Sequence, residues 1–210
     1  MKHSRLIISL LITLFLPMLF THIRAAAPEQ KDLKVVETMA RSRARELAGQ
    51  GWIPMTETPI EESLRQHLVA TECEGMAEQP GFSTKTKNRN NGRMLALSNA
   101  MSRYTDSQVS RIKGHISRQL SADDAQSSDL EHFYGAFERH LEGEIRSVLT
   151  ESLALIREND GGLCEIQILY LLNPDKESVA LANAINNAAK ETQLSDTYTA
   201  LISEALDKKR

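Results

Sequence analysis

The sequence predicts an α+β fold in which a small antiparallel sheet, including a C-terminal hairpin over about 150–172, packs against several helices. Helical periodicity occupies most of the chain, and predicted helices follow one another directly instead of alternating with strands. The best pair of strands, 150–157 and 163–172, is separated by the residues Asn-Asp-Gly-Gly at 159–162, which are typical of a hairpin turn. These features favour α+β over a doubly wound parallel sheet.

The first predicted elements are a helix over 29–48 and a short strand over 52–55. Apolar residues recur in the helix at three- and four-residue steps, and Gly49 and Gly51 end it. In the strand, Pro54 cannot donate a backbone hydrogen bond, so we expect this strand at the edge of a sheet.

A second helix is predicted from Thr58 to about Glu72. Thr58 is its expected N-cap, with Pro59 at the first position and Glu61 at the third, which is the spacing of a capping box. The Thr- and Ser-rich segment Phe82–Lys87 alternates weakly between apolar and polar residues and predicts a further strand.

A long helical pattern runs from Asn91 to Leu120. Its middle, 106–110, is polar, so the pattern is consistent with one bent helix or with two shorter helices. The turn 121–124 is expected to cap the next helix. The apolar residues assigned to the long pattern are Met94, Leu97, Met101, Tyr104, Ile112, Ile116 and Leu120.

The helix after that turn has the clearest apolar stripe in the chain, formed by Leu130, Phe133, Phe137, Leu141 and Ile145. We assign its aromatic residues to the core and not to a ligand site. In the second hairpin strand, the residues expected on one face are Cys164, Ile166, Ile168 and Tyr170. Asn173 is expected to cap a helix that Pro174 begins, and a last helix covers 194–206.

The segment 1–27 is predicted to be a cleaved signal peptide. Basic residues precede an apolar run over 6–20, and three alanines ending at Ala27 supply the small residues that signal peptidase requires. The alternative, a membrane anchor, needs about 20 apolar residues, whereas this run is shorter and contains Pro17. We therefore expect an exported protein, periplasmic or secreted, in which 28–210 form one domain without a transmembrane segment.

Charge is unevenly distributed along the chain. Removal of residues 1–27 changes the formal net charge from −3 to −6, and 85–120 then carries eight cations and one acid, whereas 122–165 carries eleven acids and three cations. We favour the interpretation that these two segments fold against each other and pair. The alternative is a basic surface that binds an anionic partner such as lipid head groups or glycan. The candidate residues of that anion-binding surface are Lys85, Lys87, Arg89 and Arg93.

Few aromatic residues interleave with these cations, so no nucleic-acid partner is expected. The chain has two cysteines, Cys73 and Cys164. In an exported protein they predict a disulfide, and the alternative is that both are small buried side chains. Both interpretations stay open, because the distance between the two Cα atoms cannot be read from spacing.

No catalytic centre is predicted. The chain has no GxSxG motif, no phosphate-binding glycine loop and no cysteine-protease signature. His132 and His140 lie eight residues apart, whereas zinc-binding helices place two histidines four residues apart. We therefore expect neither a metal nor another cofactor.

The stretch Ala44–Trp52, followed by Pro59–Leu64, is similar to the start of a family of exported bacterial envelope proteins of unknown function. Those proteins also have a first helix that ends in Gly-Trp, then a short strand and a helix with the pattern LE-x-x-L. The run Arg93–Ile116, the next helix and the hairpin ending at Leu172 look like the later elements of the same family. The arrangement of elements in that family is loosely similar to small lipoprotein domains and to the N-terminal domain of a flagellar assembly protein.

The resemblance implies an α+β envelope protein and supplies no functional residue to carry over. The chain departs from it at Phe82–Asn91, where Thr, Lys and Asn stand in place of an apolar strand. We expect a non-enzymatic binding or assembly module of the cell envelope, with an unknown envelope protein, lipid or glycan as partner. The alternative is an envelope hydrolase with a dispersed active site, which a pocket lined by convergent carboxylates or histidines would favour.

Overall fold

The structure is a computed structural model that describes residues 30–121, 127–159 and 161–207. The predicted signal peptide lies outside the described residues. The order of helices and strands is the predicted order, and the α+β fold class is confirmed. The elements are α1 (Gln30–Gly49), β1 (Ile53–Pro54), α2 (Ile60–Leu68), the π-helical turn η1 (Val69–Cys73), β2 (Ala77–Thr86), α3 (Arg89–Gln119), α5 (Ser128–Val148), β3 (Leu149–Asn159), β4 (Leu163–Leu172), α6 (Pro174–Thr192) and α7 (Asp196–Asp207).

The four strands form one antiparallel sheet in the order β1-β3-β4-β2. The predicted β3–β4 hairpin is confirmed, and its turn contains Gly161 and Gly162 at φ 86° and φ 71°, where residues with a side chain are strained. The edge position predicted for Pro54 is confirmed, because β1 pairs only with β3. The strand predicted over Phe82–Lys87 is also present, but it begins earlier, at Ala77.

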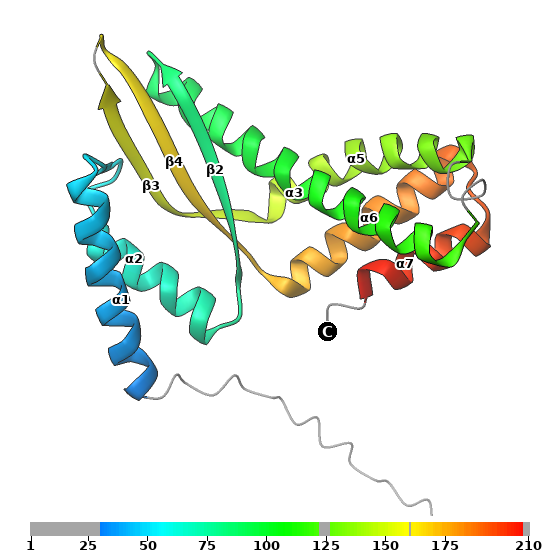
Figure 1. Ribbon diagram of the computed structural model, residues 1–210, viewed down its shortest axis with the longest axis horizontal. Coiled ribbons are helices and arrows are strands. Elements are labelled where there is room, and N and C mark those ends of the chain that lie inside the picture. The colour runs from blue at the N-terminus through cyan, green and yellow to red at the C-terminus, as the bar shows by residue number, and fades with distance from the viewer. Residues whose placement is uncertain (1–29, 122–126, 160, 208–210) are drawn as a thin grey trace, which may run out of the picture.

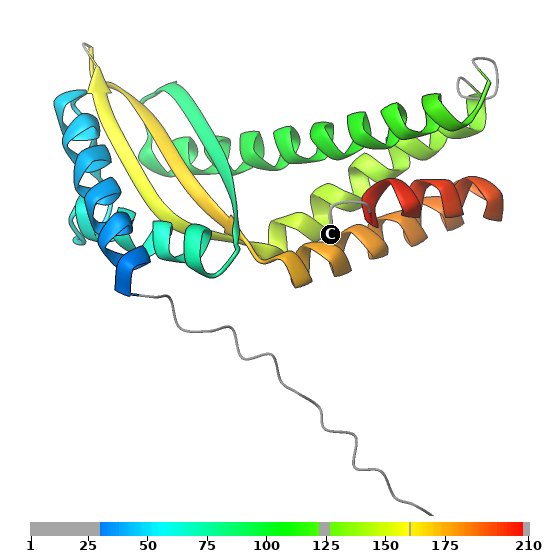
Figure 2. The same cartoon turned by 60° about the horizontal axis from the view of Figure 1, so that its bottom comes forward.

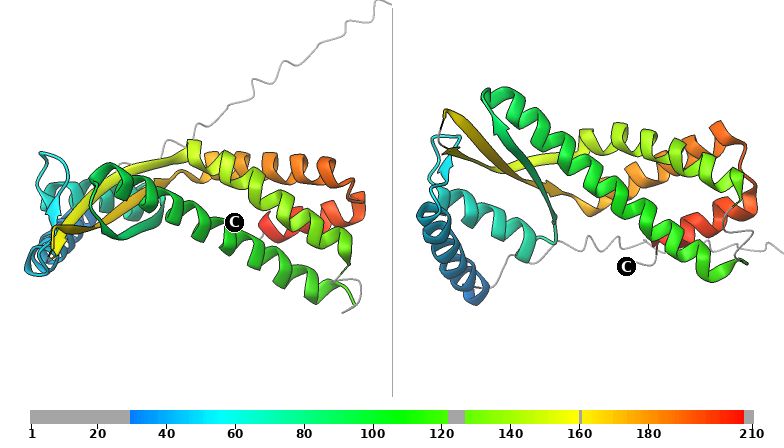
Figure 3. Two further views of the ribbon diagram at one scale, coloured as in Figure 1. Left: turned by 90° about the horizontal axis from the view of Figure 1, so that it is seen from above. Right: turned by 45° about the horizontal axis from the view of Figure 1, so that its top comes forward.

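The sheet lies between two helical layers. α1 and α2 cover one face and the first half of α3 covers the other (Figures 2 and 3). α3 then continues past the sheet and lies beside α5, α6 and α7, which occupy the opposite end of an elongated molecule (Figure 1). The β2–α3 region is therefore built at the sheet end, and the α5–α6 region at the helical end.

Alternation along β3 and β4 separates the core into different clusters. Leu153, Leu155 and Leu169 pack against α1 and α2, together with Trp52. The residues predicted to share the other face of β4 do so, and they pack against Ala96 and Ala100 of α3. A third cluster contains the predicted apolar stripe of α5, all of which is buried between helices. Each strand thus contributes to both faces, as the period of two requires.

α3 is one continuous helix of 31 residues. The polar middle does not break it, because Asp106, Ser107 and Ser110 face solvent while Val109 and Ile112 are buried on the opposite side. None of the helices within the described residues is long and apolar enough to cross a membrane.

The ends of the helices differ in part from the prediction. Asn173 caps α6 as predicted, since its Oδ1 accepts hydrogen bonds from the backbone N–H groups of Asp175 and Lys176. The capping box at Thr58 is wrong: α2 begins at Ile60, its N-cap is Pro59, and no side chain caps it. The cap predicted within 121–124 is also wrong, because the N-cap of α5 is Ser127.

Candidate functional site

The four residues predicted to bind anions lie where β2 ends and α3 begins. Asn88 caps α3 by accepting from the backbone N–H groups of Asn90 and Asn91, which places Arg89 and Arg93 on its first turns. Lys87 is exposed just before that cap, and Lys85 is part of β2. The structure therefore brings these residues to one end of the sheet.

Two of these cations already have acidic partners from β3. Arg89 donates to Glu158 at 3.0 Å, and Arg93 donates to Glu151 at 2.5 Å. The contact with Glu151 raises the pKa of Arg93. The favoured interpretation, in which the basic and acidic segments pair, holds for these residues and for Lys113, which lies 3.4 Å from Glu131. For Lys85 and Lys87, a role in binding an anionic partner stays a prediction.

Three apolar side chains of β2 and the first half of α3 are exposed: Phe82 is 39% exposed, Leu95 is 54% and Met94 is 69%. Leu95, Asn99 and Arg103 recur every four residues and therefore share one side of α3. Asn99 accepts from the backbone N–H of Phe82 at 3.2 Å, and the guanidinium of Arg103 lies 5.7 Å from the ring centroid of Phe82. We name the group Phe82, Leu95, Asn99 and Arg103 the β2–α3 surface.

Met94, one of the apolar residues of the predicted helical pattern, is exposed on α3. The buried side near the sheet is lined instead by Gly92, Ala96 and Ala100. A Cβ at Gly81 would lie 2.2 Å from the carbonyl oxygen of Ala96, so the strand and the helix approach more closely than side chains allow. The small residues at every fourth position were the signal for this contact in the sequence, and they leave the larger apolar residues outside.

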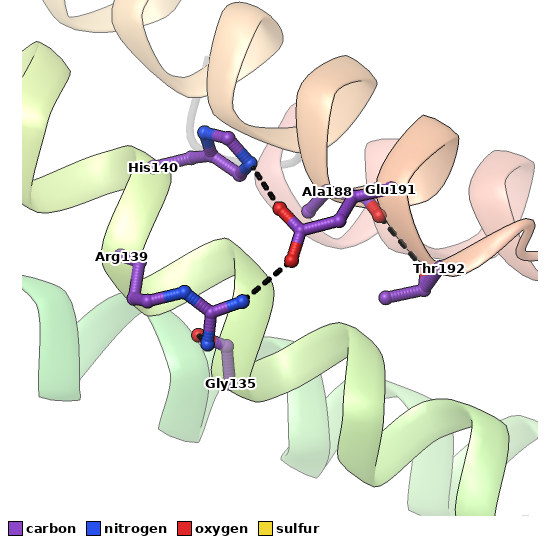
Figure 4. Close-up of polar contacts among 6 residues, drawn as sticks. All are labelled: Gly135, Arg139, His140, Ala188, Glu191 and Thr192. Carbon is purple, nitrogen blue, oxygen red and sulfur yellow. Dashed lines mark hydrogen bonds and ion pairs between the residues drawn. The ribbon is translucent and has the colours of Figure 1, made fainter.

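A second candidate site is a groove of about 550 Å³ between α5 and the end of α6. Glu191 lines it and accepts from Arg139 at 2.6 Å, and its other oxygen lies 2.8 Å from Nε2 of His140 (Figure 4). These contacts, with His140 first and Arg139 second, lower the pKa of Glu191. The lining residues are Glu131, His132, Gly135, Arg139, Glu191, Thr192 and Gln193.

This α5–α6 groove brings together the two histidines that were noted eight residues apart, because both lie on the side of α5 that faces α6. His132 lines the groove and His140 binds its carboxylate. Within the described ranges no group of three or more His, Cys, Asp or Glu side chains is arranged to hold a metal ion. Glu191 is an ionised carboxylate that contacts Arg139 and His140. At this groove it therefore provides a negative charge and not a proton for catalysis.

A contact between a buried histidine and a carboxylate, which the sequence did not indicate, joins α2 to β2. His67 is fully buried, and its Nε2 lies 2.6 Å from Oε2 of Glu78, which also lies 4.0 Å from Arg43. Nδ1 of His67 is buried without a hydrogen-bond partner among the described residues. The two residues belong to different elements eleven positions apart, so no local pattern could have paired them.

The hydrogen bond from His67 lowers the pKa of Glu78, with a smaller contribution from the charge of Arg43. A carboxyl group with a lowered folded-state pKa contributes stability above its unfolded pKa and loses it as the pH falls through the folded value. We therefore expect Glu78→Gln to lower the free energy of unfolding at neutral pH by about 1 kcal/mol. The loss of stability between neutral pH and about pH 3 should be smaller in this variant than in the unmodified protein.

Urea denaturation over a pH series measures this difference. Glu72→Gln, which removes an exposed carboxylate from η1, is the matched control and should keep the pH profile of the unmodified protein. Parallel pH profiles for Glu78→Gln and the unmodified protein would show that the pair with His67 does not contribute to stability.

The predicted disulfide is not present, since Cys73 and Cys164 are both free thiols. Cys164 is buried on the face of the sheet that packs against α3, and its Sγ donates to the carbonyl oxygen of Thr86. Cys73 is partly buried at the end of η1 and packs against the cluster on the opposite face. The sheet lies between the two residues. Of the two interpretations of the cysteines, the second, a small buried side chain, is correct for Cys164.

No protein-family model, curated protein or solved structure matches this chain. The resemblance to exported envelope proteins therefore stays a prediction.

Proposed function

We propose that this protein is a non-enzymatic binding or assembly module of the bacterial cell envelope. The observation that carries the proposal is the β2–α3 surface, on which Phe82 and Leu95 are exposed and the guanidinium of Arg103 lies over the ring of Phe82. Large apolar side chains that gather on the outside of a folded protein are typical of interaction sites.

The rigidity of this surface supports a binding role. Gln79 donates from its side chain to the carbonyl oxygen of Ala100 at 3.0 Å, and Asn99 holds the backbone of Phe82. The close approach at Gly81 adds direct backbone contact between β2 and α3. A surface that is already ordered loses little conformational entropy when a partner binds. The envelope location rests on the predicted signal peptide and on the family resemblance.

Site-specific photo-cross-linking in the native envelope tests the binding role. A photoreactive amino acid at Leu95 should give covalent adducts, because that position contacts the partner. The matched control is Val35 on α1, which is 52% exposed against 54% for Leu95 but lies on the other side of the sheet. If the two positions give equal adducts, or if neither reacts, the proposed binding surface is wrong.

The alternative function, an envelope hydrolase with a dispersed active site, has one observation in its favour. The α5–α6 groove is lined by two carboxylates and His132, as a hydrolytic site could be. However, a hydrolase that protonates a leaving group needs a carboxyl group with a raised pKa, and the pKa of Glu191 is lowered. Hydrolysis of envelope glycan, peptide or ester substrates that Glu191→Gln abolishes would establish this alternative and overturn the binding module.

A further inference from the structure

We infer that Asn99 blocks the outer edge of β2 and so keeps it from pairing with β2 of a second copy of this protein. Within the described residues β2 is the last strand of the sheet, because it pairs with β4 on one side and with no strand on the other. The free edge of a strand presents backbone N–H and C=O groups with which another chain can pair. The blocking role of Asn99 does not depend on the proposed binding function.

The register of the sheet determines which backbone groups of β2 face that edge. Ala154 on β3 accepts from the N–H of Met55, so its backbone groups face β1 and those of its neighbour Leu155 face β4. Leu155 lies opposite Gln167 on β4, so the backbone groups of Gln167 face β3. Gln167 also lies opposite Phe82, and the backbone groups of Phe82 therefore point away from β4, to the outer edge.

Three residues of β2 share this direction where the ladder is regular, because backbone groups alternate between the two edges of a strand. These residues are Glu78, Pro80 and Phe82. Pro80 has no backbone N–H. The N–H of Phe82 donates to Oδ1 of Asn99 on α3 at 3.2 Å. Two of the three backbone donors that an added strand would use are therefore missing or occupied.

Asn99 takes the place of a neighbouring strand. A ladder hydrogen bond joins nitrogen and oxygen at about 2.7–3.2 Å, so Oδ1 of Asn99 lies where the carbonyl oxygen of an added strand would lie. One turn later on α3, the guanidinium of Arg103 lies 5.7 Å from the ring centroid of Phe82. Gln79 donates to the carbonyl oxygen of Ala100 and holds α3 beside β2 (Figure 1). A second copy would have to displace Asn99 before its strand could pair.

The side chains beside this edge would favour pairing if the edge were open. Phe82 is 39% exposed and Leu95 is 54% exposed. A free strand edge with exposed apolar side chains is typical of association between copies. The bulge between Ser83 and Thr86 interrupts the regular spacing of backbone groups toward the end of β2. The ladder that a second copy could extend is thus limited to 77–83, which contains the residue that Asn99 binds.

Sedimentation velocity over a concentration series tests the role of Asn99. Asn99→Ala removes the acceptor and leaves the N–H of Phe82 free. We expect the sedimentation coefficient of this variant to rise with concentration toward that of a dimer of the unmodified species, a rise that the unmodified protein does not show. Asn99→Asp keeps an acceptor and should sediment as the unmodified protein does. Alanine is the better helix former, so we expect Asn99→Ala to fold, and circular dichroism checks this.

The matched control is Asn187→Ala, which makes the same substitution at an exposed position of α6. It should sediment as the unmodified protein does at every concentration. Hydrogen exchange at the backbone amide of Phe82 checks the contact itself. At the lowest concentration of the series, this amide should exchange faster in Asn99→Ala than in the unmodified protein.

Equal exchange at Phe82 in Asn99→Ala and in the unmodified protein would show that Asn99 does not occupy this donor. Faster exchange without association, or equal association of the control, would show that opening the edge of β2 does not cause pairing. Either result overturns the inference.

Discussion

Gly81→Ala is expected to lower the free energy of unfolding by about 3 kcal/mol, the upper part of the range for overpacked sites. The new Cβ would lie 2.2 Å from the carbonyl oxygen of Ala96 and 2.9 Å from its carbonyl carbon. Both atoms belong to the backbone of α3, so they cannot rotate away as the end of a side chain can. Gly81 itself pairs with Ile168 in the centre of the β2–β4 ladder, which prevents β2 from moving outward without losing hydrogen bonds.

Urea denaturation of Gly81→Ala, with Gly143→Ala as the matched control, measures this effect. Gly143 lies on the exposed side of α5, and no atom lies within 4 Å of the position that its Cβ would occupy. The same substitution should therefore stabilise the protein there by about 0.5–1 kcal/mol, because alanine is the better helix former. The close approach of β2 and α3 would be refuted if both variants changed stability in the same direction.

Phe137→Ala is expected to destabilise the protein by about 3–5 kcal/mol. Phe137 is fully buried in the helical cluster, and its ring stacks on Phe133 with centroids 5.8 Å apart and an interplanar angle of 14°. Truncation removes this contact and leaves a cavity among α3, α5 and α6, whose other side chains are held in place by their own packing.

Thermal and urea denaturation of Phe137→Ala should be compared with those of Phe82→Ala. The second variant makes the same truncation at a side chain that is 39% exposed and whose ring contacts the guanidinium of Arg103. Its expected cost is about 1 kcal/mol, since an exposed cation–π contact is weak. A similar loss of stability in both variants would mean that the stripe of α5 is not the core of the helical end.

The sequence alone predicted the elements that depend on residues close together in the chain. The apolar stripe of α5, the glycine turn of the β3–β4 hairpin and the cap at Asn173 depend on residues within a few positions of each other, and all three are present. The prediction for Thr58 failed although its spacing was correct, since α2 begins at Ile60 after Pro59 and no side chain caps it. The length of α3 also depended on packing along its buried side.

The candidate sites were harder to predict from the sequence than the fold. The basic residues near the start of α3 were identified, but their partners Glu151 and Glu158 come from β3, more than fifty positions away. The exposure of Met94 was missed because its position fits a helical period equally well on the inner or the outer side of α3. Only the contact of Gly92, Ala96 and Ala100 with the sheet decides which side faces outward.

By itself, the sequence determined the class of the fold, the order of its helices and strands, and the one-sided charge of the segment that begins at Lys85. These properties follow from periodicity, turn residues and composition, which act over short stretches of chain. The tertiary structure alone decided that the sheet separates Cys73 from Cys164, that His67 meets Glu78, and that Met94 and Leu95 face outward. Each of these depends on which distant segments pack together, because close packing lets only one side of a helix or strand approach its neighbour.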